Sequence, residues 1–283
     1  MERLPNFFSA LGSFWTVVAA FPPGAQAFYS FAALVLLVIG GMFIRQYSVT
    51  STMLKTSSAT AQLERKSLGG DTAAILELSI SDSPRALEVL STVLGSNVSD
   101  NVRKVAAQAL ANLKDPERVT SLGACLQREK WEVAAACAQG LGRSRDERAI
   151  PYLIRALELN VDWLVAQKSA EALGFFPASP RVTAALVAAL DIGSFPGEAA
   201  KQSLVNEGAG AVPHLTEYML GHRSPAGLQL AVDAVGLIGD SGAIPALKQL
   251  RDRVKSGGEE QRRKDQLGTA IDRAIQRCGG APQ

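Results

Sequence analysis

Aromatic residues, cysteines and histidines are all scarce in this sequence of 283 residues. Aromatic residues make up only 6% of the chain, so its core must be built from Ala, Leu, Val and Ile, which suits helices packed closely against helices. The two histidines, His214 and His222, lie eight positions apart, and no Cys, Asp or Glu near them completes a metal site. We therefore predict no catalytic residue, no metal site and no cofactor.

The three cysteines, Cys125, Cys137 and Cys278, are an odd number without the spacing of a metal site. This pattern suits buried thiols in a reducing compartment better than a disulfide framework. A bond between Cys125 and Cys137 would require their Cα atoms to lie within ~7 Å of each other.

The chain also lacks an excess of charge of one sign. It contains 29 Lys and Arg and 27 Asp and Glu residues, which give a formal net charge of +2. A dedicated nucleic-acid binder usually carries a strongly basic face. We therefore expect no nucleic acid among the partners, and no small-molecule substrate is evident either.

The stretch from Leu4 to Ile44 contains no charged residue. Its second half, Ala25–Ile44, is long enough as a helix (~30 Å) to cross the hydrocarbon core of a bilayer, where a helix satisfies its own backbone. A buried helix of a soluble domain is the competing interpretation, but such helices rarely run so long without a polar face. We predict a transmembrane helix over 25–44 with the lipid bilayer as a partner; its apolar residues are Phe28, Phe31, Leu34, Leu36, Leu37, Ile39, Phe43 and Ile44.

Residues 1–24 form a separate, shorter apolar segment, which ends at Pro22-Pro23-Gly24. It forms a helical hairpin with the next run, lies flat in the membrane interface, or is the core of a cleaved signal peptide. Of the lysines and arginines, only Arg3 precedes the apolar region, whereas Arg45 and Lys55 follow it closely. The positive-inside rule therefore predicts a membrane protein whose C-terminal domain is cytoplasmic.

Residues 45–70 are rich in Ser and Thr and are predicted to be a linker that ends at Gly69-Gly70. From residue 71 to 278 a pattern repeats, and a short tail follows over 279–283. The repeat is marked by a small residue followed by an apolar one, in steps of 31, 32, 31 and 31 residues; the apolar anchors are Leu110, Leu141, Leu173, Leu204 and Val235. A fixed period of this length predicts stacked units, none of which can bury its apolar face alone.

Each unit is predicted to contain two helices, because a turn with capping chemistry such as Asp115-Pro116 precedes each pair. Residues 71–81 are expected to form a single capping helix. The predicted pairs are 84–94 with 100–113, 116–128 with 131–142, 147–158 with 162–174, 179–190 with 196–206, 209–220 with 225–238, and 242–255 with 260–277.

Two sequence features resemble a known family. The segment that starts at Val102 has the form Val-Arg-x-x-Ala-x-x-Ala-Leu, and Ile150-Pro151 and Ile244-Pro245 each follow a turn with Asp. These features are similar to HEAT repeats, in particular the short HEAT-like repeats first recognised in phycobilisome lyases. The resemblance implies an all-α, right-handed α-solenoid of HEAT-like helical hairpins. In this chain we expect the N-terminal membrane helix, or helices, to precede it. The sequence departs from the pattern after the first repeat, because Ala replaces the arginine, so no arginine ladder is expected.

The predicted site is a protein-binding groove on the second helices, which line the concave face of a HEAT-type stack. Trp131 and Trp163 hold the same position in consecutive units, and Phe195 falls near it in the next. Such a row of aromatic residues is a typical anchor for a partner helix or peptide, although each ring could instead pack between repeats. Polar residues of the same helices complete the predicted partner-binding set: Arg103, Gln139, Arg143, Gln167, Lys168 and Glu171.

The function favoured by these features is that of a membrane-anchored HEAT-repeat scaffold or adaptor that is not an enzyme. It would bind a membrane-associated protein partner at the cytoplasmic surface, as an assembly factor or accessory subunit of a membrane complex. One alternative is a lyase-like or chaperone-lyase enzyme, which the phycobilisome-lyase resemblance implies. A second alternative is a nucleic-acid-binding protein like the HEAT-like DNA glycosylases.

Overall fold

The computed structural model describes residues 59–81, 83–129, 131–159, 162–221, 224–256 and 261–279. The chain divides into two units, Met1–Ala61 and Gln62–Gln283, and only residues 59–61 of the first unit are described. The fold reported below is therefore that of the second unit. Its described residues form helices and turns and contain no strand.

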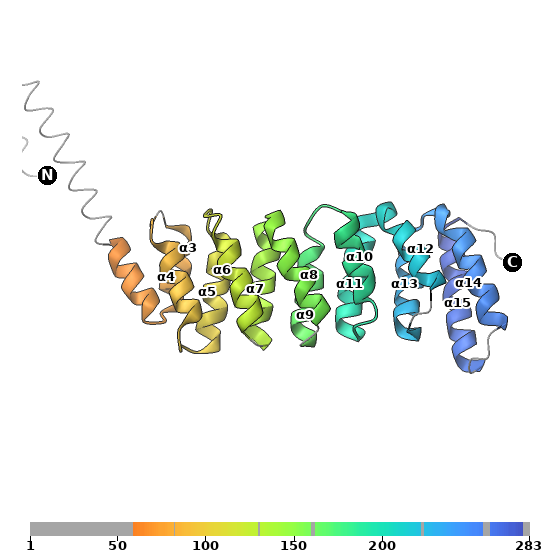
Figure 1. Ribbon diagram of the computed structural model, residues 1–283, viewed down its shortest axis with the longest axis horizontal. Coiled ribbons are helices and arrows are strands. Elements are labelled where there is room, and N and C mark those ends of the chain that lie inside the picture. Colours follow the sequence, from red (N-terminus) through yellow and green to blue (C-terminus); the bar gives the residue numbers. More distant parts are fainter. Residues whose placement is uncertain are drawn as a thin grey trace, which may run out of the picture. The chain divides into compact units, whose positions relative to one another are not determined.

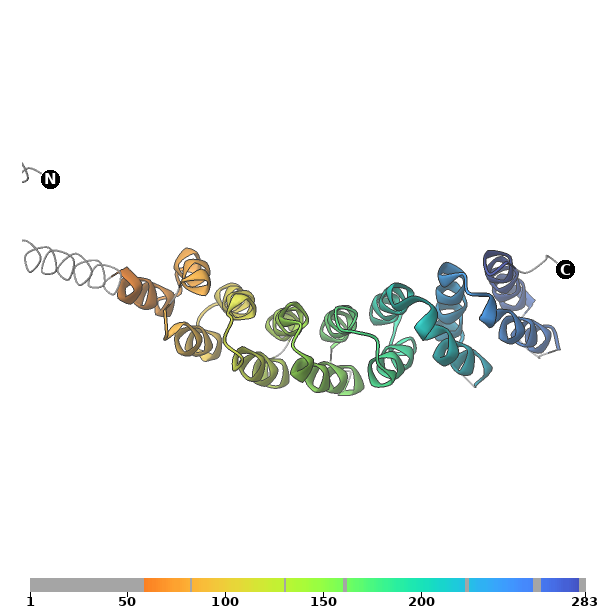
Figure 2. The same ribbon diagram turned by 90° about the horizontal axis from the view of Figure 1, so that it is seen from above.

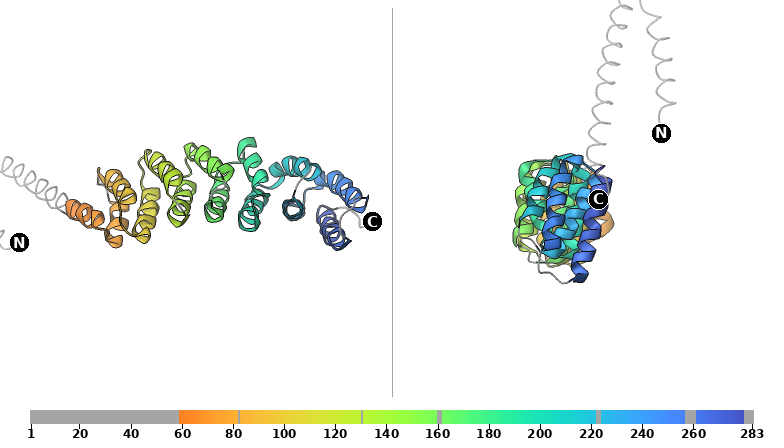
Figure 3. Two further views of the ribbon diagram at one scale, coloured as in Figure 1. Left: turned by 60° about the horizontal axis from the view of Figure 1, so that its bottom comes forward. Right: turned by 90° about the vertical axis from the view of Figure 1, so that its right-hand side faces the viewer.

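Paired helices follow one another in chain order along the second unit (Figure 1). Seen from above, they form two layers along a curved row (Figure 2), and seen along that row they run roughly parallel (Figure 3, right). After α3 (Thr72–Ile80), the pairs are α4 (Ala86–Gly95) with α5 (Asp100–Asn112), α6 (Arg118–Arg128) with α7 (Trp131–Ser144), α8 (Ile150–Leu159) with α9 (Trp163–Leu173), α10 (Pro180–Ala189) with α11 (Ser194–Glu207), α12 (Val212–Leu220) with α13 (Pro225–Ile238), and α14 (Ile244–Ser256) with α15 (Gln261–Arg277). The all-α solenoid predicted from the repeat is confirmed, and most helix boundaries agree within a few residues.

Side-chain caps determine where several of the second helices begin. The Ser99 hydroxyl accepts a hydrogen bond from the backbone of Val102, and the Asp162 carboxylate accepts one from Leu164 at 2.8 Å. Ser224 caps α13 in the same way. These short polar side chains satisfy backbone N–H groups that have no partner within the helix, so they mark the start of the second helix in the first, third and fifth pairs.

The core is a continuous apolar layer to which each repeat contributes its anchor residue. All five anchors predicted from the sequence are fully buried: Leu110, Leu141, Leu173, Leu204 and Val235. The second helices approach one another closely because small residues lie between them. A Cβ atom on Gly142 of α7 would lie 2.8 Å from the Cα of Ala172 in α9. This close approach explains why alanine and glycine, rather than aromatic residues, dominate the second helices.

The turns ahead of α8 and α14 are short 3-10 helices, η1 (Glu147–Ala149) and η3 (Ser241–Ala243), each capped by an aspartate. Asp146 accepts hydrogen bonds from the backbone and side chain of Arg148. The Arg148 side chain also donates to the carbonyl of Pro116, 3.0 Å away in the preceding repeat. The hydrogen bond from the Arg148 side chain is the main reason why the pKa of Asp146 is lowered to about 2. The turn therefore links consecutive repeats. A third such helix, η2 (Gly208–Ala211), precedes α12.

The predicted transmembrane helix over 25–44, its apolar residues and the segment before it lie outside the described residues. Within the described ranges, no helix is both long enough and apolar enough to cross a membrane. The predicted linker extends into the described part, where 59–68 is helical. There Glu64 accepts a hydrogen bond from the Ser83 hydroxyl at 2.8 Å, so these residues contact the start of the first pair.

Candidate functional site

A pocket of about 600 Å³ lies between two consecutive repeats, the α6–α7 pair and the α8–α9 pair. The end of α6 with Glu129 and the first turn of α7 form one wall, and residues of α8 form the other. The residues that line it are Leu126, Gln127, Arg128, Glu129, Trp131, Ala134, Tyr152, Arg155, Ala156, Leu159, Asp162 and Val165. Its volume falls in the range of pockets that enclose organic ligands.

Two aromatic side chains form much of the wall. The ring of Tyr152 lies directly over α6 at Gly123, where an added Cβ would meet its Cε1 at 2.6 Å. Trp131 begins α7 with φ of 56°, in the left-handed region that bulky residues rarely adopt. Its side chain is 68% exposed, so it stands at the rim rather than in the core. The pocket therefore presents flat apolar surfaces that a conjugated ligand could cover.

Two acidic residues of the pocket already have partners. Glu129 accepts a hydrogen bond from Arg103 in α5 at 2.5 Å, and Asp162 caps α9 through its backbone amides. Arg103 also donates to Asp100, and this hydrogen bond is the largest of the interactions that raise the pKa of Arg103. The Glu129 carboxylate therefore pairs with α5, and the Asp162 carboxylate stabilises the start of α9.

The two arginines of the pocket, Arg128 and Arg155, are exposed. Among the described residues neither has a carboxylate partner within ion-pair distance, and the Nε of Arg128 reaches only the carbonyl of Ala124 at 3.4 Å. Two unneutralised guanidinium groups beside aromatic walls suit a flat ligand that carries carboxylates. In the same part of the chain, no cluster of His, Cys, Asp and Glu could hold a metal ion.

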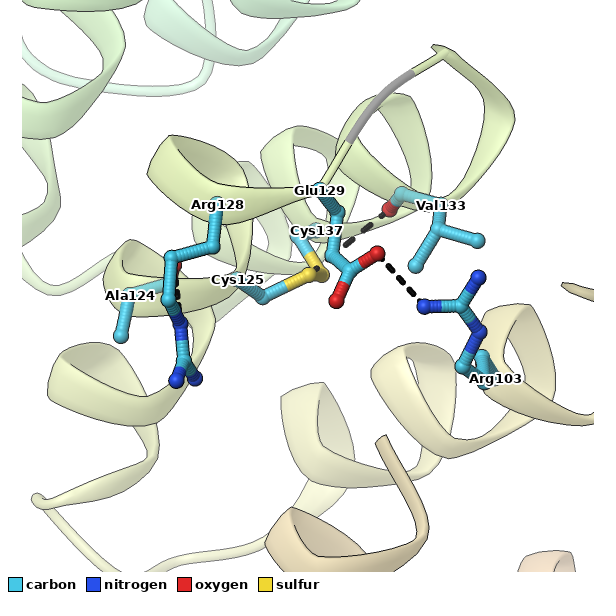
Figure 4. Close-up of a disulfide and its surroundings, with 7 residues drawn as sticks. All are labelled: Arg103, Ala124, Cys125, Arg128, Glu129, Val133 and Cys137. Carbon is cyan, nitrogen blue, oxygen red and sulfur yellow. Dashed lines mark hydrogen bonds and ion pairs between the residues drawn. A yellow bond between two sulfur atoms is a disulfide. The ribbon is translucent and has the colours of Figure 1, made fainter. Parts of the chain in front are cut away.

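A disulfide joins Cys125 of α6 to Cys137 of α7, and Figure 4 shows it together with Arg128 and Glu129, two residues that line the pocket. The expectation of separate structural thiols is corrected here. The two helices form a hairpin, and the 12-residue spacing brings the two Cα atoms to 6.2 Å, inside the range that a disulfide spans. Cys278 is free and buried, and desolvation by this burial raises the pKa of its thiol.

Of the three aromatic residues predicted to line a groove, only Trp131 lines this pocket. Trp163 and Phe195 are also exposed, at 53% and 62%, and their ring centroids lie 5.0 Å apart. The exposure of all three shows that none of them is a buried contact between repeats.

The predicted polar residues fall into separate groups. Gln167 and Lys168 both donate to Glu171 within α9, whereas Arg103 pairs across the repeats with Glu129. Arg143 is exposed, and Gln139 is half-buried in α7. Whether these residues bind a partner stays a prediction.

Sequence reasoning missed Tyr152, Arg128 and Arg155, because nothing in the repeat pattern distinguishes them from surface residues. One signal was present: Gly123 interrupts the apolar pattern inside a helix, which often marks the close approach of another group.

Two family models match this part of the chain. Residues 119–205 match HEAT repeats, and residues 102–128 match the PBS lyase HEAT-like repeat. Residues 102–205 are HEAT repeats. The HEAT-repeat likeness inferred from the sequence is thereby confirmed for these residues, and the pocket between α6–α7 and α8–α9 lies within them.

A curated relative is the phycocyanobilin lyase subunit alpha of Synechococcus elongatus, 35% identical over 82 residues. The match covers 29% of this chain and 27% of that protein, so the chain spans about a quarter of its relative's length.

Two solved structures also align. The CpcE–CpcF complex of phycocyanin lyase from Nostoc sp. PCC7120 does so with a TM-score of 0.41 and 19% identity, over 71% of this chain and 87% of that one. Human deoxyhypusine hydroxylase in complex with glycerol aligns with a TM-score of 0.40 and 17% identity, over 80% of this chain and 99% of that one. Likenesses at this level carry no argument about function.

The curated relative corrects two expectations from the sequence. The protein was predicted to be a scaffold or adaptor and not an enzyme, but the relative that matches it is a subunit of a lyase. Both predictions are therefore wrong, and the lyase-like alternative is the better supported one. The physical reason for the error is that a pocket formed between repeats has no sequence motif, so the absence of a catalytic motif did not exclude an enzyme.

Proposed function

We propose that this protein is a subunit of a lyase-type enzyme that binds a bilin-like pigment in the pocket between the α6–α7 and α8–α9 pairs. The observation that carries the proposal is the 35% identity to a phycocyanobilin lyase subunit. The pocket supports it as well, because its two aromatic residues and two exposed arginines suit a flat ligand that carries carboxylates.

The pocket and a bilin are complementary in shape and charge. A bilin is a long conjugated pigment that carries carboxylate side chains. In the proposed complex its conjugated system packs against Trp131 and Tyr152, and its carboxylates accept hydrogen bonds from Arg128 and Arg155. The apolar residues between them, Leu126 and Leu159 among others, exclude water from the middle of the ligand.

Glu129 and Asp162 have a different role in this account. Because Glu129 holds Arg103 and Asp162 caps α9, each keeps one wall of the pocket in place. We assign them positioning roles and assign binding roles to the two arginines and the two aromatic residues.

A protein partner is part of the proposal, because the relative's name describes it as one subunit. The exposed Trp163 and Phe195 pair is the candidate contact for such a partner, since exposed aromatic side chains are typical anchors of protein interfaces. The predicted polar residues Gln167, Lys168 and Glu171 lie on α9, the helix that Trp163 begins, and would border this contact.

The membrane anchor also remains part of the proposal. The uncharged run over 25–44 supports a transmembrane helix, and the arginines and lysines that follow it support a cytoplasmic location for the repeats. We also propose that the solenoid is right-handed, because HEAT repeats, which the sequence resembles, form right-handed solenoids.

The proposal is tested by titrating the full chain, kept in a mild detergent, with phycocyanobilin and following its absorption spectrum. Arg155→Gln should weaken binding about tenfold or more, because a hydrogen bond between charged groups contributes about 1.5–3 kcal/mol. Arg181→Gln, an exposed arginine of α10 away from the pocket, is the matched control and should bind like the wild type. Absence of binding by the wild type would reject the proposal, and equal losses in both variants would reject the pocket as the site.

A further inference from the structure

We propose that the Cys125–Cys137 disulfide controls the pocket, so that a dithiol reductant loosens its wall and weakens what it binds. The effect on ligand affinity rests on the proposed function. The effect of the disulfide on the wall of the pocket does not depend on which ligand binds there. The starting observation is where the bond lies in the chain. Half of the twelve lining residues fall between its two cysteines: Leu126, Gln127, Arg128, Glu129, Trp131 and Ala134.

The wall that the disulfide closes contains a strained residue. Trp131 has φ of 56°, and a bulky side chain adopts this conformation only when the surrounding structure enforces it. The disulfide ties together the helices on both sides of that residue, α6 before it and α7 after it. Opening the bond therefore removes one of the constraints that hold Trp131 and the neighbouring Arg128 in place.

A second pocket borders the disulfide on the side of Cys125. This smaller pocket, of about 230 Å³, is lined by residues of α4 and α6, and Cys125 is one of them. Both cysteines are buried, Cys125 with 2% of its surface exposed and Cys137 with none, and only Cys125 borders this pocket. Arg128 and Glu129 line both this pocket and the larger one, so the two pockets share one wall. Cys125 is therefore the sulfur nearer to solvent, and we assign the attack of an incoming thiolate to it when the shared wall opens.

The chemistry is ordinary thiol–disulfide exchange with a dithiol. One thiolate of the reductant attacks the Sγ of Cys125, a mixed disulfide forms, and Cys137 leaves as a thiolate that takes up a proton. The second thiol of the reductant, as its thiolate, then attacks the reductant's own sulfur in the mixed disulfide and releases Cys125, which also takes up a proton. The protein gains two electrons and two protons, and the reductant leaves as its own disulfide.

The reduced hairpin should stay folded. The Sγ of Cys125 lies 3.9 Å from the carbonyl of Val133 and has no proton while it is bonded, but the reduced thiol could donate a weak hydrogen bond there. The apolar contacts between α6 and α7, including Leu122 against Gly140, do not depend on the disulfide. Reduction therefore acts on Arg128, Glu129 and Trp131 rather than on the repeat as a whole.

The experiment compares the full chain in detergent before and after reduction by dithiothreitol. Hydrogen exchange is followed over residues 127–133, and phycocyanobilin is titrated in both states. Reduction should speed exchange in this segment, leave exchange in α13 and α15 unchanged, and weaken phycocyanobilin binding several-fold. Cys278→Ala should respond to the reductant like the wild type. The double variant Cys125→Ala, Cys137→Ala should resemble the reduced protein in both conditions, and circular dichroism checks that it folds.

Unchanged exchange over 127–133 after complete reduction would overturn the inference, and so would faster exchange with equal phycocyanobilin affinity. If the oxidised protein does not bind phycocyanobilin at all, the proposed function fails. The exchange measurement then decides the inference alone, because faster exchange still supports disulfide control of the wall and unchanged exchange still overturns it.

Discussion

Gly123 is the residue on which the shape of the pocket depends most directly. A Cβ atom added to residue 123 would lie only 2.6 Å from the Tyr152 ring, which is closer than a side-chain contact allows. Because Gly123 has no side chain, the Tyr152 ring can pack directly against α6 of the preceding repeat. Gly95, at the end of α4, has no atom within 4 Å of the same position and has no such role.

Gly123→Ala should destabilise the protein by about 1–3 kcal/mol, because the added methyl group overpacks the contact and pushes Tyr152 away. Gly95→Ala is the matched control and should be neutral or slightly stabilising, since alanine favours helices. Denaturant unfolding followed by circular dichroism measures both free energies. Equal, small effects would show that Tyr152 does not rest on Gly123.

Trp163 packs against one aromatic neighbour rather than inside the core. It is half-exposed and contacts Phe195 across the repeat boundary. Trp163→Ala should therefore lower the free energy of unfolding by about 1 kcal/mol, the scale of one aromatic pair. A loss of about 3–5 kcal/mol, typical of a buried aromatic side chain, would contradict the exposed position. Phe195→Ala should cost no further stability in the Trp163→Ala background.

At the scale of elements, the α6–α7 hairpin is the best-constrained unit of the described row. It combines helix packing with a disulfide between residues 12 positions apart. Closing a loop of this length restricts the unfolded chain and stabilises the folded state by about 3 kcal/mol. Its neighbours among the described residues are held by packing, helix caps, turn hydrogen bonds and ion pairs, and none of them contains a disulfide.

Reduction with dithiothreitol should accordingly lower the free energy of unfolding by up to about 3 kcal/mol, as measured by urea unfolding in matched buffers. Cys278→Ala should keep the difference between the oxidised and reduced protein, because Cys278 is outside the bond. An identical midpoint with and without the reductant would show that the bond makes no difference to stability.

The turn at Asp146 predicts a pH dependence. Its folded-state pKa of about 2 lies below the ordinary value of 3.8, so the charged carboxylate stabilises the fold. This contribution is fully present above about pH 4 and is lost as the pH falls towards 2. Because Arg148 is half-exposed, solvent screening limits the effect to about 1 kcal/mol.

Asp146→Asn should therefore lose about 1 kcal/mol at neutral pH, with the difference from the wild type disappearing as the pH approaches 2. Thermal unfolding at a series of pH values measures this convergence. A difference that stays constant over the whole range would mean that the charge on Asp146 does not contribute.

At the scale of the molecule, the repeat period alone predicted the fold, because every unit must bury the same face. Leu110, Leu141 and the later anchors are all in the core, and Asp146 and Asp240 both cap turns as their position suggested. The pocket could not be predicted in this way, since it lies where two repeats meet and depends on Gly123 and Tyr152 being opposite each other. The disulfide was missed for a similar reason: the angle between two helices, not their sequence, decides whether two cysteines meet.

The pocket between the α6–α7 and α8–α9 pairs is the proposed binding site for a bilin-like ligand. The most direct test is a phycocyanobilin titration of Trp131→Ala beside Trp163→Ala. The two tryptophans are matched, because both are exposed and both begin the second helix of consecutive repeats, but only Trp131 lines the pocket. The account predicts that Trp131→Ala weakens binding about tenfold, in line with an aromatic contact of 0.5–1.5 kcal/mol plus lost apolar area, while Trp163→Ala binds like the wild type. Equal affinities for the two variants, or a loss confined to Trp163→Ala, would contradict it.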